Sequence, residues 1–430
     1  MKPHDDQNPT AGIQRSMVLG CALLAWLCSG ILLAVPPLAA RAAVASMGVE
    51  EEASRGRWFS WYVCAFLLGA AAGGLGLGWL GDRVGRAKAL GWSVLTYSLL
   101  AGLAYFVRTP EQLLVLWFLA STGVGGVWPN GVSLAAEALP GVSRPLVAGL
   151  FGAAANLGLM LLALLVVWYP ISADHWRWVM LVSAAPAVLG VFILMVVPES
   201  HGWRLHQQRA QQARANAGAN ASGASTNVIH EVFRPPLLRY TLIGIVLGTI
   251  PLMGNWGASN WLVPWANQVQ DQAELSTLSG WTQWMKSAGG VVGSLLGGWV
   301  ASLCGRRTAY CLMSAAALTV SFHIFHSLSP RDESFLTWVF LQGFFGTIFF
   351  GWLPLYLPEL FPTHVRATGT GVAFNWGRIL TAFGVLGGGQ LMQHFDGDYA
   401  RVGQITCLVY ALGIFLVWLA PDTSQVRIDA

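Results

Sequence analysis

The sequence predicts an all-α membrane protein of twelve transmembrane helices in two six-helix bundles that are parallel repeats of each other. Two observations predict the helices: 55% of the 430 residues are apolar while 10% are charged, and runs of about 20 mostly uncharged residues recur along the chain. Because no water satisfies backbone polar groups inside a bilayer, these runs are expected to be helices rather than strands. Matched landmarks in the two halves predict the repeat.

The expected spans follow one another along the whole chain. They cover residues 16–40, 57–80, 89–107, 112–137, 145–168, 177–197, 240–266, 278–301, 308–327, 335–358, 367–390 and 403–420. The first run is too long for the apolar part of a secretory signal, and further spans follow it, so it is expected to be the first transmembrane helix. The high Gly and Pro content fits helices that pack closely and bend.

Charge and cysteine usage restrict the class of protein further. Segments on the side of the two termini carry about twice as many Lys and Arg residues as the opposite loops, which predicts that both termini are cytoplasmic. The net charge of +4 therefore reflects orientation in a lipid bilayer, and nucleic acid is not an expected partner. The six cysteines lack the spacing of a metal site, so free thiols are expected.

A polar stretch divides the chain. Residues 204–230 are rich in Ala, Gln, Asn and Ser and contain almost no large apolar side chains, so they cannot form a core of their own. We expect an N-terminal bundle over 1–200, a cytoplasmic linker over 201–236 and a C-terminal bundle over 237–430.

Three landmarks recur at a nearly constant offset of about 220 residues, the shift that a duplicated six-helix unit of this length produces. The pairs are GWLGDRVGR (78–86) with GWVASLCGRR (298–307), EALPGVSRPLVAG (137–149) with ELFPTHVRATGTG (359–371), and VPES (197–200) with APDT (420–423). Parallel repeats of this kind place a substrate site near the bilayer midplane between the halves.

These landmarks carry a resemblance to a known family. GWLGDRVGRAKAL resembles the loop between the second and third helices of the major facilitator superfamily, and PES, PELFPT and PDT are similar to landmarks of its sugar porter and organic acid symporter branches. FNWGRILTAFG, in the expected eleventh helix, resembles the sialate and aromatic acid symporter branches more than the sugar porters. The resemblance covers the whole chain and implies the major facilitator fold, alternating access and a bacterial inner membrane.

Charged residues gather at the expected cytoplasmic ends of the helices, where a carboxylate can bridge an arginine and face the positive end of a helix dipole. They are Asp82, Arg83, Arg86, Glu137, Arg144, Glu359 and Arg366. The resemblance implies that such pairs close the cytoplasmic side in the outward-facing state and separate when the halves rock. The alternative is that they only set topology and solvate loops. Ser302 stands where Asp82 stands in the first copy, so the set is expected to be asymmetric.

Two cations lie inside expected spans, whereas every acid can be placed outside the membrane centre. An unpaired cation in hydrocarbon costs at least about 2.5 kcal/mol, so Lys286 and Arg378 are expected to face water, a partner or a substrate. Asn375, Arg378 and Thr381 share one helix face because they are spaced three apart. The guanidinium fork of Arg378 matches a carboxylate, so the sequence predicts that the substrate is a small organic anion.

Other polar and aromatic side chains are expected to complete the site, mainly in the C-terminal half. They are Gln283 on the face of Lys286, and Asn255, Trp256, Ser259 and Trp261 on the expected seventh helix. One alternative remains for Lys286. It shares its face with Gly289, Gly290, Gly293 and Gly297, a stripe typical of helix packing, so it would then bond a neighbouring carbonyl or reach towards the membrane surface.

Proton coupling is left open by the sequence. The resembling aromatic acid branch carries acids in its first helix, whereas residues 23–35 contain none. A histidine can carry a proton at physiological pH, which makes His323 and His326 candidates, but the resemblance places their helix at the periphery. Glu137 is the remaining carboxylate candidate. The carrier is therefore expected to be either a proton symporter or a uniporter.

We expect an alternating-access carrier of a small organic acid, with no enzymatic activity, because the chain shows neither a nucleotide motif nor a catalytic constellation. No cofactor or metal is expected. The rival transporters are a neutral sugar porter and an exporter of apolar compounds. A rival of another class is a non-transporting solute sensor, although the linker and the short tails offer no output domain.

Overall fold

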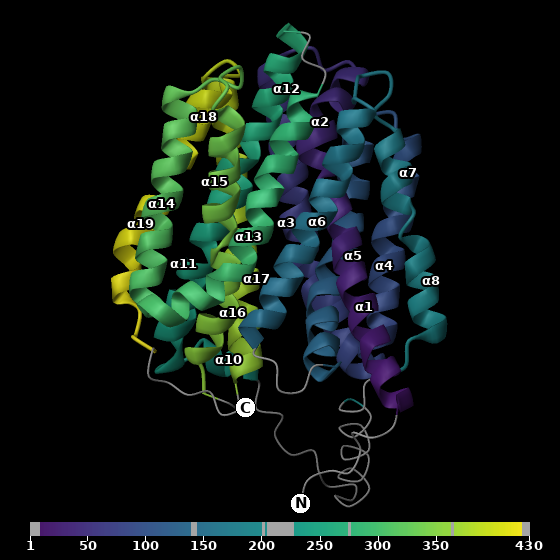
Figure 1. Cartoon of the computed structure of the whole chain (residues 1–430), viewed down its shortest axis with the longest axis vertical. Coiled ribbons are helices and arrows are strands. Elements are labelled where there is room, and N and C mark those ends of the chain that lie inside the picture. The colour runs from purple at the N-terminus through teal and green to yellow at the C-terminus, as the bar shows by residue number, and fades with distance from the viewer. Residues whose placement is uncertain are drawn as a thin grey trace, which may run out of the picture.

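The chain is described by a computed structural model that covers residues 9–138, 144–199, 203, 228–273, 277–362 and 365–423. Within these ranges the regular elements are all helical (Figure 1). The prediction of an all-α protein is confirmed.

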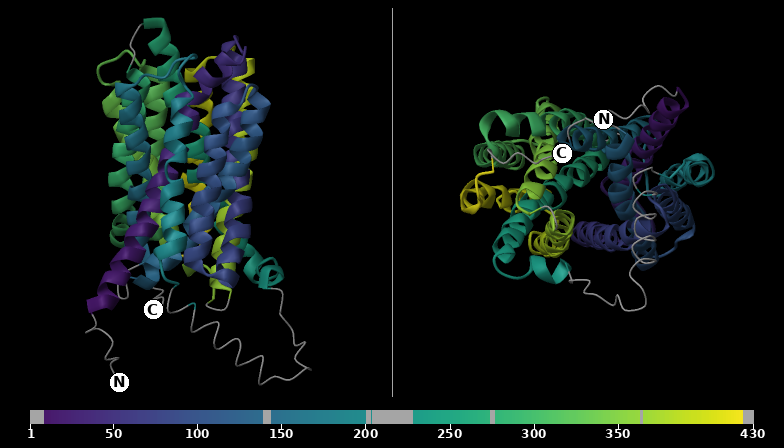
Figure 2. Two further views of the ribbon diagram at one scale, coloured as in Figure 1. Left: turned by 90° about the vertical axis from the view of Figure 1, so that its right-hand side faces the viewer. Right: turned by 90° about the horizontal axis from the view of Figure 1, so that it is seen from below.

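The N-terminal half runs from α1 to α8. Its elements are α1 (Pro9–Leu33), α2 (Val35–Ser46), α3 (Glu52–Val84), α4 (Arg86–Leu103), η2 (Ala104–Phe106), α5 (Pro110–Ala138), α6 (Arg144–Trp168), α7 (Trp178–Ala184) and α8 (Ala187–Val196). In Figure 1 this half is purple to blue and lies beside the green to yellow C-terminal half. The view from below in Figure 2 shows the same division.

The C-terminal half follows a short helix, α10 (Val228–Val232). Its elements are α11 (Leu237–Met253), η3 (Gly254–Ala258), η4 (Ser259–Trp261), α12 (Leu262–Ala273), α13 (Leu278–Cys304), α14 (Arg306–Ser327), α15 (Phe335–Thr347), α16 (Phe349–Glu359), α17 (Arg366–His394), α18 (Tyr399–Thr406), α19 (Val409–Leu416) and η5 (Val417–Leu419). We call the face where α1 begins and η5 ends the terminal face, and the opposite one the far face (Figure 1).

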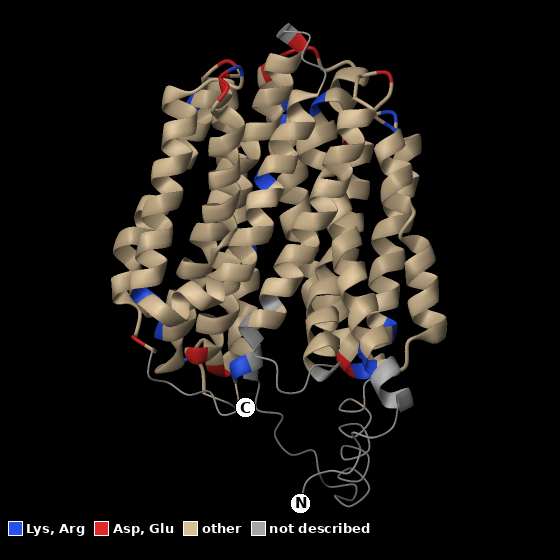
Figure 3. Ribbon diagram, viewed as in Figure 1, with Lys and Arg blue, Asp and Glu red and all other residues tan. Residues whose placement is uncertain are grey.

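The expected membrane spans correspond to helices in the structure. Eleven segments of the described chain are long and apolar enough to cross a bilayer, and the 29-residue α17, which carries Arg378, completes the twelve. Several spans are two consecutive pieces, such as α1 with α2 and α15 with α16. Figure 3 shows Lys, Arg, Asp and Glu mostly at the two ends of the bundle. This distribution is the one that a lipid environment imposes on charge.

Some helices extend beyond their predicted ends. The first span reaches Ser46, α3 begins at Glu52 and the seventh span reaches Asp271. Arg41, Glu52 and Asp271 were expected in loops but lie in helices. The physical reason is that these charges pair with one another, so they do not need to reach bulk water.

The repeated sequence landmarks occupy equivalent turns. Gly85 has φ +120° between α3 and α4, and Gly305 has φ +77° between α13 and α14. Side chains with a Cβ rarely adopt this region, which explains the glycine in both copies of the motif. The Glu199 carboxylate accepts hydrogen bonds from the backbone N–H groups of Ala87 (3.2 Å) and Lys88 (2.9 Å). It therefore caps α4 and joins two landmarks of the same half.

Glycines also allow the helices to approach closely. A Cβ on Gly73 of α3 would clash with the Thr122 carbonyl of α5, and one on Gly289 of α13 would clash with the Phe340 carbonyl of α15. Close backbone contact of this kind replaces the hydrophobic driving force that lipid cannot provide.

Candidate substrate pathway

The two halves contact each other along α3 with α17 and along α6 with α13, among other helix pairs. A Cβ on Gly56 of α3 would press against Met392 of α17, and one on Gly152 of α6 would press against Ser294 of α13. In a protein of parallel repeats, the substrate site is expected between the halves at about the middle of such helices.

Arg378 lies at the contact between α3 and α17. Its Nη1 donates to the carbonyl of Ala70 and to Oδ1 of Asn375, both over 3.4 Å, and its guanidinium carbon lies 4.8 Å from the centre of the Phe374 ring. These hydrogen bonds are long, and their acceptors are neutral. No carboxylate of the described chain lies within ion-pair distance of Arg378, so its fork can receive an anion.

Two members of the predicted α17 stripe, Asn375 and Arg378, bond to each other, and the third, Thr381, bonds to its own helix. Asn375 lies beside Arg378 and also donates through Nδ2 to the Gly371 carbonyl, over 3.0 Å. The hydroxyl of Thr381 is fully buried and donates to the carbonyl of Gly377 in its own helix, over 2.8 Å. Thr381 therefore has no hydroxyl donor left for a substrate. We call Arg378, Asn375, Phe374 and the Ala70 carbonyl the Arg378 site.

Among the glycines of α3 and α17, some face the Arg378 site and others face open space. A Cβ on Gly74 would lie 3.5 Å from Asn375 and 3.7 Å from Arg378. One on Gly76, or on Gly371 of α17, would meet no atom of the described chain within 4 Å.

The seventh span is irregular at its centre. It changes from α11 to a π-turn at Gly254–Ala258 and a 3-10 turn at Ser259–Trp261 before α12 continues. Ser259 Oγ donates to the Asn255 carbonyl (3.1 Å) and contacts Asn255 Oδ1 (3.2 Å), so these polar groups partly satisfy each other. Irregular backbone at membrane depth is tolerated where protein buries it or where it lines a cavity.

Two tryptophans of this irregular segment contact the other half. The ring of Trp256 lies 4.7 Å from that of Phe66 on α3, centroid to centroid. Trp261 packs 5.2 Å from Phe59 of α3 and 5.8 Å from Tyr399 of α18. Both predicted tryptophans therefore lie at the seam between the halves, where they close the far side of the Arg378 site.

Lys286 lies inside the C-terminal half on α13, and 8% of its surface is exposed. Its Nζ donates to Oδ1 of Asn260 over 2.7 Å. Gln283, one turn earlier, is fully buried and donates to Ser287 Oγ over 2.8 Å. Asn260 was not among the predicted site residues. The sequence feature that could have identified Asn260 is its position between Ser259 and Trp261 in the NWGASNW stretch.

Charged groups at the far face connect the two halves. Arg41 of α2 donates to both carboxylate oxygens of Glu52 on α3, over 2.7 and 2.8 Å, and forms an ion pair with Asp271 of α12. Tyr399 of α18 donates to Glu52 over 2.9 Å. We call these four residues the far-face network. Sequence reasoning missed it, although Arg41 was visible as a lone charge beside an apolar run.

The predicted gating residues lie at the terminal face. Arg83 stacks on Trp79 of its own helix, 4.0 Å from the ring centre, and the Asp82 carbonyl accepts from Trp203 over 3.0 Å. Arg86 begins α4. Arg366 begins α17 and donates to the Phe361 carbonyl over 3.3 Å.

Glu359 pairs within the C-terminal half. It accepts from Arg306 at 2.8 and 3.1 Å and from Thr423 at 2.6 Å. Arg306, which was not predicted, is the repeat counterpart of Arg86. The side chains of Glu137 and Arg144 lie outside the described residues.

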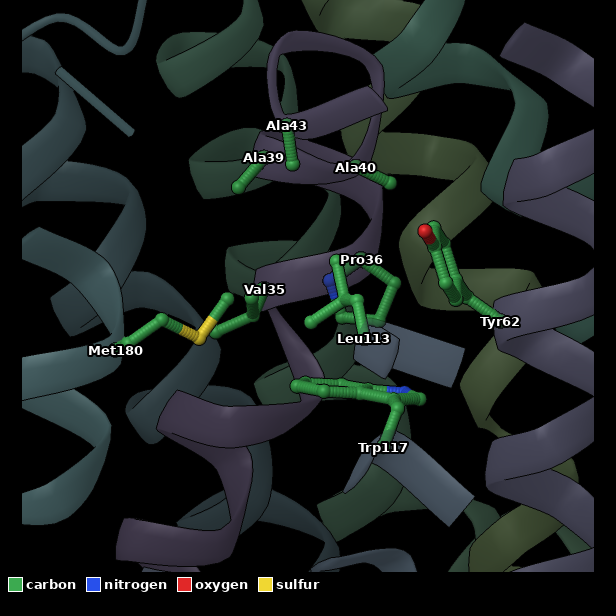
Figure 4. A pocket seen from close by; sticks show the side chains of 9 residues that line it. All are labelled: Val35, Pro36, Ala39, Ala40, Ala43, Tyr62, Leu113, Trp117 and Met180. Carbon is green, nitrogen blue, oxygen red and sulfur yellow. The ribbon is translucent and has the colours of Figure 1, made fainter. Parts of the chain in front are cut away.

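A small apolar cavity lies inside the N-terminal half, where α1 passes into α2 (Figure 4). Val35, Pro36, Tyr62, Trp117 and Met180 are among its lining residues, and its volume is about 10 Å³. That volume is at the lower limit for one water molecule, so the cavity is too small for an organic substrate.

Comparison with known proteins gives consistent matches. The family model for the Major Facilitator Superfamily matches residues 17–385. The chain is 30% identical over 369 residues to a probable 4-methylmuconolactone transporter of Cupriavidus pinatubonensis, covering 84% of this chain and 81% of that protein. It is 29% identical over 320 residues to a cis,cis-muconate transport protein of Acinetobacter baylyi, covering 73% of each.

A solved structure shows the same fold. A D-xylose-proton symporter superposes with a TM-score of 0.71 over 98% of this chain and 100% of its own, at 16% sequence identity. At that identity the likeness concerns the fold alone.

Proposed function

Because the chain belongs to the Major Facilitator Superfamily, we propose that it transports a small organic acid across a bacterial inner membrane by alternating access. The relatives named for 4-methylmuconolactone and cis,cis-muconate support an organic acid as the cargo. In this proposal the terminal face is cytoplasmic, as the excess of Lys and Arg on that side favours.

The single observation that supports an anionic cargo most is the environment of Arg378. It lies at the seam between the halves, with neutral acceptors at 3.4 Å and no carboxylate partner in the described chain. A carboxylate would form two parallel charge-assisted hydrogen bonds with the guanidinium, which are about twice as strong as neutral ones. Asn375 and the Phe374 ring would hold the guanidinium in position.

We further propose that a proton accompanies the anion. Moving one negative charge into a cell against a potential of 100 mV costs about 2.3 kcal/mol, and a proton that moves with it cancels this cost. The ring of His323 packs at a tilt on that of Trp338 with ring centres 4.3 Å apart, and His326 stacks on Phe322 at 5.2 Å, so both histidines fit a structural role.

The test is counterflow of radiolabelled cis,cis-muconate in proteoliposomes, with D-xylose as the neutral probe. We expect Arg378→Ala to reduce kcat/KM by about 10- to 100-fold, because a hydrogen bond to a charged group contributes about 1.5–3 kcal/mol. Arg378→Lys keeps the charge but loses the fork, and should retain part of the activity. Arg331→Ala, at an exposed arginine of the α14–α15 loop, is the control.

Three outcomes would contradict the proposal. Unchanged muconate transport in Arg378→Ala would show that the Arg378 site does not bind the substrate. Counterflow of D-xylose without muconate would indicate a neutral sugar porter. Binding of muconate without any counterflow would indicate a solute sensor.

A further inference from the structure

We propose that Lys286 and Asn260 form a second anion-binding site, which holds the carboxylate of the transported acid nearer the far face than the Arg378 site does. This inference rests on the proposed function, because it assigns a second station to the same cargo. We call these two residues the Lys286 pair.

The Lys286 pair is a buried cluster of donors. Lys286 is 8% exposed and Asn260 is 5% exposed. The ammonium has three N–H donors, and the Asn260 side-chain oxygen accepts one of them, over 2.7 Å. The Asn260 amide nitrogen is buried and has no hydrogen-bond partner in the described chain. A buried donor without an acceptor is costly, and an anion would satisfy it.

The positive charge of this cluster is not neutralised by its neighbours. No carboxylate of the described chain lies within ion-pair distance of Lys286. The nearest turn of α13 contributes Gln283, whose buried side-chain oxygen also has no partner among the described residues. The adjoining elements present Gly343 of α15 and Asn156 of α6, both uncharged. The cluster therefore combines one cation with a free amide donor, which is the chemistry that binds a carboxylate.

The Lys286 pair lies at a different depth from the Arg378 site. Trp261, next to Asn260, packs on Phe59 of α3, whereas Arg378 contacts Ala70 of the same helix. Eleven residues of α-helix separate these contacts, which at 1.5 Å per residue is about 16 Å.

A second helix gives the same depth difference. Trp261 lies beside Gly388 of α17, ten residues from Arg378, or about 15 Å. One carboxylate therefore cannot contact both cations at once. The two cationic sites are therefore successive stations for one carboxylate.

The far-face network lies beyond the Lys286 pair. Glu52 precedes Phe59 by seven residues of α3, which places it about 10 Å nearer the far face. The acid entering from that face would therefore meet the Lys286 pair before the Arg378 site. A station of this kind lowers the cost of taking a carboxylate past the apolar seam formed by Phe59, Trp261 and Tyr399.

The sharpest test is Asn260→Asp, which keeps the side-chain volume and gives Lys286 an internal carboxylate at the position of its present acceptor. Lys286→Met removes the charge at similar size, and Lys286→Arg retains it. Ser302→Ala, on the same helix and bonded only to the Gly298 carbonyl, is the matched control. The probe is radiolabelled cis,cis-muconate, measured both by transport in proteoliposomes and by equilibrium binding to the purified carrier.

We expect Asn260→Asp and Lys286→Met to reduce kcat/KM for transport at least tenfold. Equilibrium binding at the Arg378 site should stay within about twofold, and Lys286→Arg should restore part of the transport. If Arg378→Ala lost muconate binding while the Lys286 variants transported muconate normally, the second station would be overturned and the proposed function would stand. Normal transport in the Arg378 variants would overturn the proposed function itself.

Two further results would overturn the assignment of the Lys286 pair as a carboxylate-binding site. Removing a buried charge is often neutral or stabilising, so a Lys286→Met carrier with a raised melting temperature and normal transport would show a merely structural lysine. Replacing sucrose, which is uncharged, by sodium chloride in the buffer tests the other source of an anion. If chloride inhibits muconate transport by the unmodified carrier, and Asn260→Asp transports muconate at the normal rate without this inhibition, the site would be assigned to inorganic anions and the carboxylate assignment would be overturned.

Discussion

The two ends of the molecule use charge in different ways. At the far face, Arg41 and Glu52 of the N-terminal half contact Asp271 and Tyr399 of the C-terminal half. At the terminal face, Glu359 is bound by Arg306 and Thr423 of its own half. Charged groups therefore join the two halves at the far face, while the pair of Glu359 with Arg306, the Glu359 pair, stabilises the C-terminal half at the terminal face.

The far-face network connects the two halves of the bundle at that end of the molecule. An alternating-access carrier must break the far-face network to open at that face, whereas pairs inside one half can persist throughout the cycle. The far-face network is thus expected to set the balance between the two states, and the Glu359 pair to set stability.

The largest effect is expected from Arg306→Ala. The Glu359 side chain is 2% exposed, and removal of its arginine leaves a buried charge without compensation, which costs about 3–5 kcal/mol. The melting temperature of the purified carrier should therefore fall markedly. Arg401→Ala, which breaks the exposed pair with Asp398, should change it little. An unchanged melting temperature in Arg306→Ala would show that Glu359 does not depend on this partner.

A smaller effect is expected from Arg41→Ala, which releases Glu52 and Asp271 together. The pair with Glu52 is partly exposed, so we expect a shift of about 1–3 kcal/mol towards the state open at the far face, roughly 5- to 150-fold in population. The measurement is the distance between spin labels at Glu50→Cys and Arg331→Cys, both exposed at the far face, with Cys304 replaced by Ser.

Arg55→Ala is the matched control for this experiment, because Arg55 contacts Glu52 from the same helix at 3.5 Å and crosses no seam. A distance distribution that moves equally in both variants would mean that the far-face network does not hold the halves together.

The smallest effect is the difference in stability expected between Gly305→Ala and Gly85→Ala, at two equivalent turns of the terminal face. The Cβ of Gly305→Ala would meet no atom of the described chain within 4 Å, so this variant should be destabilised only by backbone strain at φ +77° and ψ 159°, which costs about 1–3 kcal/mol for a residue other than glycine. Gly85→Ala carries the same strain and also collides with the Glu199 carboxylate that caps α4. Thermal unfolding should therefore show a larger loss of stability for Gly85→Ala than for Gly305→Ala. Equal losses would show that the Glu199 carboxylate can move aside without destabilising the protein.

Much of the fold was predictable from sequence, and so were several residues of the candidate site. Apolar runs located the helices, and the repeated motif located Gly85 and Gly305 in equivalent turns. The isolated cations in two of those runs drew attention to Arg378 and Lys286. Thr381 shows the limit of such reasoning, because periodicity placed it on the face of Arg378 while its hydroxyl bonds to Gly377 of its own helix.

What the sequence determined by itself is where the chain crosses the membrane and which few cations remain within those crossings. Hydropathy and backbone hydrogen bonding are local properties, so both follow from runs of about 20 residues. Only the tertiary structure decided that Arg41 meets Asp271, that Lys286 meets Asn260 and that Glu359 meets Arg306. Each of these partners comes from another helix, and which helix approaches depends on the packing of small residues across the whole bundle.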